Sequence, residues 1–366
     1  MLLIGQRIDV EQLADGLAGS ADILGQLRFE RELLAAGQQV DKAADAGGQE
    51  RQLIGDVRGV LVQALEHEAV GKRSGGVEQA VGHGQADGEP ALGILAVCML
   101  LTAAAQVIHA ILLGGGSAFG LDAAGGVMRY LEERGIGFDV GVTKVPLVCQ
   151  SDLFDLTVGD AHTRPDAAMA YQACVNAETG NYRDGNYGAG TGATVGKLLG
   201  MPHCMKSGIG SYAVQVGPLQ VGAVVAVNAL GDIYDWRTGR KAAGLLADDG
   251  KTFLDSEDVI LQQLDAAGEK FVGNTTIGAV FTNAKFDKAH LCKIAAMTHD
   301  GYARAIRPVH TANDGDSIYA VSLGDLAADQ DVVGALAARV MAEAILRAVQ
   351  AADSAYGFPA AKDLKL

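Results

Sequence analysis

The sequence has few cysteines and no paired cysteine motif. The five are widely spaced and odd in number, and they stand at Cys98, Cys149, Cys174, Cys204 and Cys292. This pattern argues against a disulfide framework and against a zinc ribbon. The eight histidines form no H-E-x-x-H motif and no cluster of ligands. We therefore predict a chain in the reducing cytoplasm, with no metal and no cofactor.

Basic residues are also in short supply. The chain has 29 Lys and Arg against 44 Asp and Glu, which gives a formal net charge of -15. An acidic surface of this size repels phosphate backbones, so we expect no nucleic-acid partner. Hydrophobic residues make up 49% of the 366 residues and charged residues 20%. This composition is typical of a globular chain with a sizeable core.

Aromatic residues and prolines are almost missing from the first 106 residues, which contain only Phe29 and Pro90. A core without aromatics lacks its largest contributors of buried area. We therefore treat residues 1–106 as an atypical N-terminal segment. Its start lacks the basic residues, apolar core and small-residue cleavage site of a signal peptide.

One long hydrophobic run, residues 91–113, contains no Asp, Glu, Lys or Arg. Its length matches the roughly 20 apolar residues that cross a bilayer. However, Gln106 and His109 interrupt the run, and a glycine turn follows it directly. We expect a buried strand entering a turn here, and no membrane partner.

After residue 106, β-rich runs and helical spacings alternate loosely. The β-rich runs are 107–113, 221–228, 276–282 and 318–323, and the helical spacings cover about 121–133, 287–305 and 331–351. There is no fixed-period repeat, no long linker and no regular βαβ unit. The pattern predicts an α+β layered sandwich rather than a doubly wound sheet.

Three short motifs come close to familiar sites and fail. In GAGTGATVGK (188–197), the spacing of a P-loop is wrong, and Leu198 supplies no hydroxyl for Mg²⁺. In GGGSAFG (114–120), Phe119 stands where a nucleophile elbow needs glycine. The D-G-D run at 314–316 lacks the remaining acidic ligands of a calcium loop.

Four segments, taken in order and with their spacing, carry a resemblance to a known family. They are HAILLGGGSAFGLDAAGGVMRYLEERG (109–135), GAGTGATVGK (188–197), GNTTIGAVFTNA (273–284) and HTANDGDSIYA (310–320). Over about residues 107–350 the chain resembles the DmpA-type self-processing aminopeptidases and the related nylon-oligomer hydrolases. The resemblance implies a four-layer αββα sandwich of the DmpA and ornithine-acetyltransferase type, similar to N-terminal-nucleophile hydrolases. It also implies a homo-oligomer, a tetramer or larger.

The resemblance further implies autocatalytic cleavage of the Asn274–Thr275 bond. One domain would then consist of an α subunit, 1–274, and a β subunit, 275–366. A new N-terminal threonine supplies its own base, because its free α-amine lies within reach of its hydroxyl. The ordinary pKa of such an amine, about 8, is close to working pH. The expected activity is hydrolysis of small peptides or amides through a Thr275 ester, without a cofactor.

The family's other site residues carry over to four positions. Asp314 and Asp316 match the acidic pair that holds the nucleophile, and Lys197 matches the lysine that approaches the threonine. Asn228 matches the asparagine that donates to the developing oxyanion. Each position also has a plain structural interpretation: a solvated turn for 314–316, a surface lysine for Lys197 and a strand-end residue for Asn228. We expect His310 to be an ordinary packed, hydrogen-bonded residue.

The chain departs from the family pattern in places. The stretch Asp56–Val62 matches the family's first strand only weakly, and the following R-G-G-x-P-G-like segment is missing. Phe154 stands where some aminopeptidases have a tyrosine, so no phenol role carries over. Two other functions stay open. One is an acyltransferase of the ornithine-acetyltransferase type, and the other is an unprocessed, non-catalytic homologue.

Overall fold

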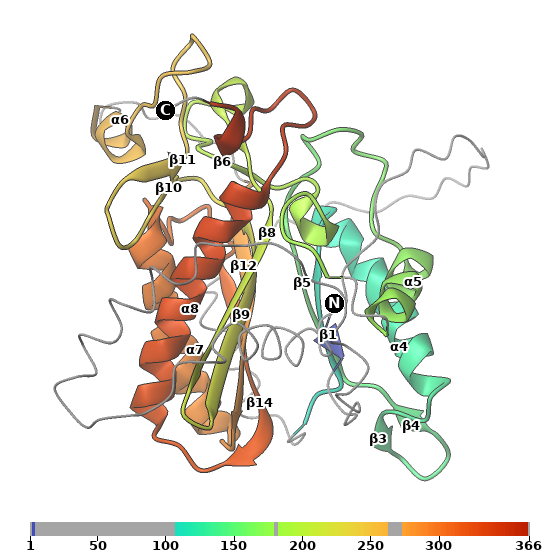
Figure 1. Ribbon diagram of the computed structural model, residues 1–366. Coiled ribbons are helices and arrows are strands. Elements are labelled where there is room, and N and C mark those ends of the chain that lie inside the picture. The colour runs from blue at the N-terminus through green and yellow to red at the C-terminus, as the bar shows by residue number, and fades with distance from the viewer. Residues whose placement is uncertain (1, 4–106, 179–181, 263–272, 365–366) are drawn as a thin grey trace, which may run out of the picture.

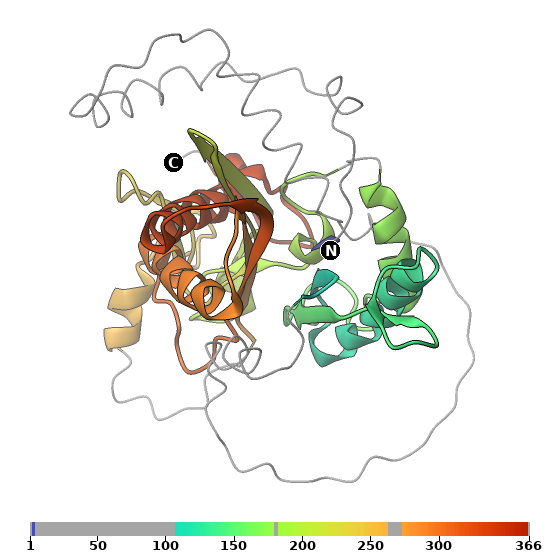
Figure 2. The same cartoon turned by 90° about the horizontal axis from the view of Figure 1, so that it is seen from below.

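The computed structural model describes residues 2–3, 107–178, 182–262 and 273–364. In these residues the chain forms four layers, with a helical layer on each side of two facing sheets (Figure 1; seen from below in Figure 2). This arrangement confirms the predicted α+β class and the αββα order. The weak strand match at Asp56–Val62 lies outside the described residues.

The larger sheet has the strand order β14-β12-β9-β8. These strands are β8 (Ile209–Val216), β9 (Leu219–Asn228), β12 (Thr275–Ala284) and β14 (Ser317–Leu326). Strand β12 runs antiparallel to β9 and parallel to β14. The start of β12, the end of β9 and the turn that leads into β14 therefore lie together near residue 275.

The second sheet pairs β2 (Ala110–Gly114) in parallel with β5 (Val148–Asp152), and β1 (Leu2–Leu3) lies on the other side of β2. Side chains alternate across a strand, so each strand serves two cores. Ile111 of β2 packs toward the larger sheet, whereas Leu112 packs toward the outer helices. This double burial explains the almost continuous apolar run that predicted a strand here.

Strand β12 shows the same alternation. Ile277, Ala279 and Phe281 pack between the two sheets, whereas Val280 faces the helices on the other side. Gly278 also faces these helices: a Cβ there would lie 3.0 Å from the Met341 side chain. Strand β12 is therefore in the middle of the core, paired with β9 from Thr275 onward and with β14 from Ile277 onward.

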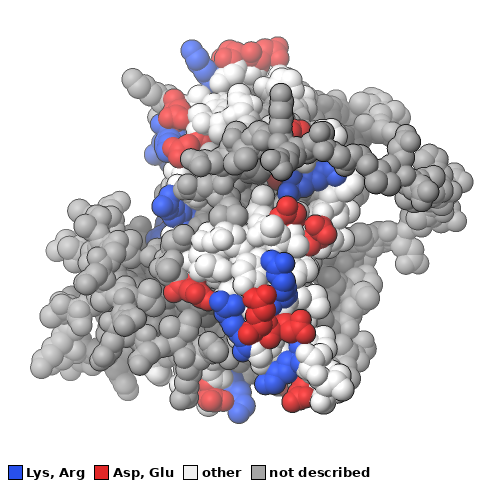
Figure 3. Space-filling view, turned by 90° about the vertical axis from the view of Figure 1, so that its right-hand side faces the viewer, with Lys and Arg blue, Asp and Glu red and all other residues white. Residues whose placement is uncertain are grey.

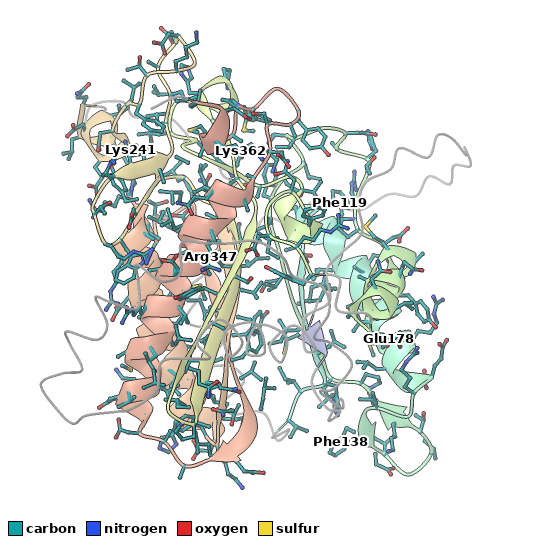
Figure 4. The ribbon with its side chains drawn as sticks, in the orientation of Figure 1. Phe119, Phe138, Glu178, Lys241, Arg347 and Lys362 are labelled. Carbon is teal, nitrogen blue, oxygen red and sulfur yellow. The ribbon has the colours of Figure 1, made fainter. Side chains whose placement is uncertain are left out.

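Two long helices, α7 (Lys288–Ala305) and α8 (Gln330–Ala351), form one outer layer. Aspartates cap both N-termini: Asp287 accepts from the His290 amide, and Asp329 accepts from the amides of residues 331 and 332. Arg347 projects from α8 (Figure 4), and its guanidinium lies 4.3 Å from the ring centroid of Tyr212 on β8. This contact adds a cation–π interaction to the helix–sheet packing.

The other outer layer consists of a 3-10 turn, η2 (Ser117–Ala123), and the helices α4 (Ala124–Glu132) and α5 (Ala167–Ala177). Figure 3 views this side of the molecule and shows acidic and basic side chains interspersed. An example is the ion pair of Arg134 and Glu178, 2.8 Å apart. On this face, the acidic excess of the chain does not form a patch of a single sign.

Smaller elements connect these layers. They are β3 (Phe138–Asp139), β4 (Lys144–Val145), η3 (Gly188–Gly190), β6 (Thr194–Val195), η4 (Met201–His203), β7 (Met205–Lys206), β10 (Asp232–Tyr234), β11 (Lys241–Ala243), α6 (Ser256–Gln262), β13 (Ile306–Arg307) and η5 (Ala361–Asp363). Strands β11, β10 and β13 form a small third sheet. Asp232 is fully buried in it and accepts hydrogen bonds from Lys241 Nζ (2.6 Å), labelled in Figure 4, and from the Leu245 amide (2.7 Å).

The predicted runs 221–228, 276–282 and 318–323 are confirmed as β9, β12 and β14. The helical spacings 287–305 and 331–351 are confirmed as α7 and α8. The strand expected over 107–113 begins at Ala110, and the helix expected from about 121 opens as the 3-10 turn η2. Within the described part of the chain, no helix is long and apolar enough to cross a membrane. Residues 91–106 of the hydrophobic run lie outside that part.

A buried lysine, Lys206, holds the loop around η3 against β7. Its Nζ donates to the carbonyl oxygens of Gly190 (2.8 Å), Ala193 (3.1 Å) and Ser207 (2.5 Å). Burial lowers the pKa of this amine to about 7. The Ala193 carbonyl also accepts from the Ser207 amide at 3.0 Å, so Lys206 adds a second donor there and joins three carbonyl groups through one buried side chain.

The variant Lys206→Met is expected to lower the free energy of unfolding by about 2 kcal/mol, because three carbonyl groups each lose a hydrogen bond from a buried donor. The pKa of Lys206 in the folded chain is below its ordinary value of 10.5. Between pH 7 and 10.5 the unfolded chain therefore binds more protons, and Lys206 makes stability rise with pH. Urea titrations at pH 7 and pH 9 should show a smaller rise in the variant. An equal rise in both proteins would contradict this assignment.

Candidate active site

Thr275 lies where β12 begins, half-buried, with its Oγ1 donating to the carbonyl oxygen of Asn274 at 2.6 Å. The antiparallel register of β9 and β12 places Asn228 opposite Thr275. A parallel bridge places Asp314 beside Asn274. Sheet pairing thus brings together residues that are far apart in the sequence and that the family resemblance had assigned to one site.

The carbonyl of Asn274 accepts a second hydrogen bond, from the Gly315 amide at 2.9 Å. Gly315 lies close to the threonine, because a Cβ added to it would be 3.2 Å from Thr275 Oγ1. The Asn274 side chain is buried, and its amide atoms have no hydrogen-bond partner among the described residues. The Asn274–Thr275 bond is therefore polarised at its carbonyl and flanked by an unsatisfied polar group.

Lys197 is 4% exposed, so the alternative interpretation as a surface lysine is wrong. Its Nζ donates to Asn228 Oδ1 (2.5 Å), to the Asn228 carbonyl (3.1 Å) and to the Gly273 carbonyl (3.2 Å). Burial lowers the pKa of Lys197 to about 7. At neutral pH this amine therefore exists in both charged and neutral forms, and it contacts the carbonyl of Gly273, two residues before Thr275.

Asn228 is fully buried at the end of β9. Its Oδ1 accepts from the Thr194 amide at 3.1 Å as well as from Lys197. Its Nδ2 donates to the Phe154 carbonyl (2.9 Å) and, more weakly, to the Gly273 carbonyl (3.5 Å). Asn228 thus connects the lysine to the chain segment just before the Asn274–Thr275 bond.

The two aspartates have different surroundings. Asp316 is 6% exposed; its Oδ1 accepts from the Thr276 amide at 2.8 Å, and its Oδ2 lies 2.8 Å from His310 Nδ1. The interpretation of a solvated turn is therefore wrong for Asp316. Asp314 Oδ2 accepts from the Thr311 amide at 2.7 Å. Burial, and then the negative charge of Asp316, raise the pKa of Asp314 to about 6.

The sequence analysis missed two residues beside this pair. Tyr302 of α7 is fully buried and donates to the carbonyls of Thr276 (3.2 Å) and Ser317 (3.3 Å), which ties the starts of β12 and β14 together. His310 stacks on the Tyr302 ring and forms the ion pair with Asp316. The expectation that His310 is packed and hydrogen-bonded is confirmed, but its place six residues before Asp316 did not predict their contact.

Residues 107–178, 182–262 and 273–364 include no group of three or more His, Cys, Asp or Glu side chains that could hold a metal ion. The polar groups around Thr275 are instead a hydroxyl, an amine, a carboxamide and two carboxylates. Such a set suits proton transfer and stabilisation of an oxyanion, which are the requirements of acyl transfer.

A family model, peptidase family S58, matches residues 52–362. The chain belongs to peptidase family S58. The match contains residues 107–350, over which the four motifs predicted the resemblance, and extends beyond them at both ends. The predicted family and the prediction of a hydrolytic enzyme are confirmed.

The relatives of this chain have names that describe hydrolytic enzymes. The chain is 40% identical over 280 residues to an uncharacterised aminopeptidase of Mycobacterium leprae, covering 69% of this chain and 75% of that protein. It is 31% identical over 258 residues to a 6-aminohexanoate-oligomer endohydrolase of Kocuria sp., covering 66% and 72%. Both names describe hydrolases, in line with the family.

Among solved structures, the chain is similar to the L-aminopeptidase D-Ala-esterase/amidase of Ochrobactrum anthropi, described as a variant of the Ntn hydrolase fold. The TM-score is 0.45 and the sequence identity 20%. The match covers 64% of this chain and 63% of that one, so this chain spans less than two thirds of that structure.

Proposed function

We propose that this S58 peptidase is an N-terminal-threonine amide hydrolase, which cleaves itself between Asn274 and Thr275 and then acts on small peptides or amides. The observation that carries the proposal is the 2.6 Å hydrogen bond from Thr275 Oγ1 to the Asn274 carbonyl. It places a hydroxyl against the carbonyl of its own peptide bond. Lys197 and Asn228 lie on one side of this bond, and the two aspartates lie on the other.

In the uncleaved chain, the nitrogen of Thr275 belongs to an amide and cannot accept the hydroxyl proton. Lys197 supplies an amine whose pKa burial lowers to about 7, so a neutral fraction is available as a base. Thr275 Oγ1 bonds to the Asn274 carbonyl carbon, the peptide C–N bond breaks, and the proton goes to the departing nitrogen. The Gly315 amide, 2.9 Å from the carbonyl oxygen, stabilises the oxyanion of this step.

Water then hydrolyses the ester, which leaves a carboxylate on Asn274 and a free amine and hydroxyl on Thr275. That amine becomes the base for the next reaction, on an amide substrate. The positive charge of Lys197 lowers the pKa of the amine, whereas the carboxylates favour its charged form. Asn228 Nδ2 lies 3.5 Å from the Gly273 carbonyl before cleavage. In the cleaved enzyme it donates to the oxyanion of the substrate.

The relatives support an amide substrate. Their names, aminopeptidase and 6-aminohexanoate-oligomer endohydrolase, both imply cleavage of an amide bond. Membership of a peptidase family favours transfer of the acyl group to water over transfer to an amine such as ornithine. We also propose, from the family resemblance, a cytoplasmic homo-oligomer of four or more copies.

Intact-mass measurement and N-terminal sequencing of the purified protein test the proposal directly. We expect two chains, 1–274 and 275–366, of which the second begins Thr-Thr-Ile-Gly. Incubation of an acyl donor with and without ornithine should give the same rate of hydrolysis and no acylated ornithine. A single full-length chain that still hydrolyses amides would place the activity elsewhere in the molecule.

A further inference from the structure

The pair formed by His310 and Asp316 has a feature that the proposed reaction does not explain. His310 has a backbone φ of 56°, in the left-handed region that residues other than glycine seldom occupy. Such a conformation is unfavourable for a residue with a Cβ and persists only where the surrounding structure imposes it. Here it accompanies a 2.8 Å contact between His310 Nδ1 and Asp316 Oδ2.

Side chains of α7 hold the imidazole of His310 in place. The ring stacks on Tyr302, with centroids 5.8 Å apart and planes 24° apart. The Nε2 of His310 lies 3.3 Å from His299 Nδ1. With Asp316 at Nδ1, both ring nitrogens and one ring face have a neighbour, so the orientation of the imidazole is set by the fold.

Of the two histidines near Asp316, His310 and His299, only His310 holds a positive charge readily. The hydrogen bond to Asp316 raises the pKa of His310. Burial, and then the charge on His310, lower the pKa of His299 to about 4, so the positive charge of the histidine pair resides on His310. Tyr302 contributes no charge. Asp314 Oδ1 has no hydrogen-bond partner in the described residues, while the charge of His310 lowers the pKa of Asp314 and the charge of Asp314 raises that of Lys197.

We propose that His310 is a positioning residue, which holds the Asp316 carboxylate against the start of β12 and supplies the positive charge beside the pair of carboxylates Asp314 and Asp316. The inference rests on the proposed function of Thr275. The connection runs from His310 to Asp316, then to the Thr276 amide at 2.8 Å, and so to the residue that follows the nucleophile. His310 itself does not contact the scissile bond.

The physical reason is that two neighbouring carboxylates titrate as a pair, with pKa values that belong to both groups. A cation fixed on one carboxylate keeps that group charged and leaves the proton to the other. Without His310, two negative charges in a mostly buried site would lack this cation, and the pair would retain its proton to higher pH. The active form, with both carboxylates ionised, would then be lost at a higher pH than in the natural protein.

The variant His310→Gly tests this role without straining the fold, because glycine adopts a φ of 56° readily. We expect the acid limb of the pH profile of kcat/KM to move upward by about one pH unit. The variant His310→Gln retains a neutral donor, so its kcat at high pH should approach that of the natural protein while its acid limb still moves. If both profiles fall by the same factor at every pH with unmoved limbs, His310 has only a structural role and the proposal is wrong.

A second histidine–aspartate pair supplies the matched control. His290 Nδ1 lies 2.7 Å from Asp287 Oδ1 in the first turn of α7, where both side chains are exposed. The variant His290→Ala removes a histidine–aspartate pair with a similar distance between its two side chains. This pair is not part of the site around Thr275. Its pH profile should coincide with that of the natural protein, and a shifted limb would show that any lost histidine charge has this effect.

Histidine titration by NMR in the Thr275→Ala protein separates this proposal from the proposed function, since it requires neither cleavage nor hydrolysis. The His310 resonances should titrate above the ordinary pKa of 6.5, and Asp316→Asn should bring them down. If His310 titrates at or below 6.5 in both proteins, the positioning role is refuted even if the chain cleaves and hydrolyses amides. If His310 behaves as expected in the Thr275→Ala protein while the natural chain is never cleaved, the proposed function fails instead.

Discussion

Replacing Thr275 with alanine is expected to leave the chain in one piece and to reduce amide hydrolysis by a factor on the order of 10⁵–10⁶, the effect typical of removing a nucleophile. The hydroxyl that contacts the Asn274 carbonyl is lost, so neither the ester nor the free N-terminal amine can form. Denaturing gels and intact mass report the cleavage, and turnover of an amino-acid amide reports the hydrolysis.

The variant Thr275→Ser is the control, because serine keeps the hydroxyl and fits a half-buried strand position. We expect it to cleave and to retain activity. The serine variant should unfold thermally close to the natural protein, and the uncleaved alanine variant should still unfold in a cooperative transition, which shows that the effect is chemical. An alanine variant that still yields the 275–366 fragment would refute the assignment of Thr275.

The second large effect is expected from Lys197→Met, which should slow self-cleavage by about 10³-fold, as the loss of a general base typically does. Since burial lowers the pKa of Lys197 to about 7, its neutral form is depleted as the pH falls. Cleavage in the natural chain should therefore slow about tenfold for each pH unit below 7. Chain synthesised in a cell-free reaction, sampled over time on denaturing gels, gives these rates.

Two further variants distinguish a base from a fixed charge. Arginine cannot lose its proton in proteins, so Lys197→Arg should remain slow if Lys197 acts as a base and should cleave if only its charge is needed. Lys206→Met removes another buried lysine with a similarly lowered pKa. It should lower stability without slowing cleavage in the folded chain. If Lys197→Met cleaves as fast as Lys206→Met, Lys197 has no role in the chemistry.

The core strands and the two long helices could be predicted because their apolar spacing is local. Val280 and Ile277 alternate across β12 in a way that the sequence already shows. The order β14-β12-β9-β8 is not local, and neither is the pairing that places Asn228 opposite Thr275. The resemblance to a family placed Asn228 and Thr275 in one site, but the strand order and the pairing were not predicted, since no periodicity specifies which strands become neighbours.

The parts of the site that escaped prediction depend on backbone geometry. His310 reaches Asp316 with a left-handed backbone conformation, which a histidine in the sequence gives no reason to expect. Tyr302 has the spacing of an ordinary core residue on α7, and only the packing shows its hydroxyl joining Thr276 and Ser317. The lowered pKa of Lys197 likewise follows from its burial. The glycines before Lys197 in the sequence give no indication that this side chain is buried.

The position of Thr275 at the first residue of a central strand has a consequence for how the mature protein is assembled. The proposed cleavage there would leave β8 and β9 on one polypeptide and β12, β14, α7 and α8 on the other, so that two chains would share a single sheet. Unfolding would then separate a non-covalent heterodimer, and recovery would become a bimolecular event that dilution disfavours. An intact precursor would refold as one chain, whereas the proposed cleaved form would depend on a structure completed before the cut, and its stability would be kinetic.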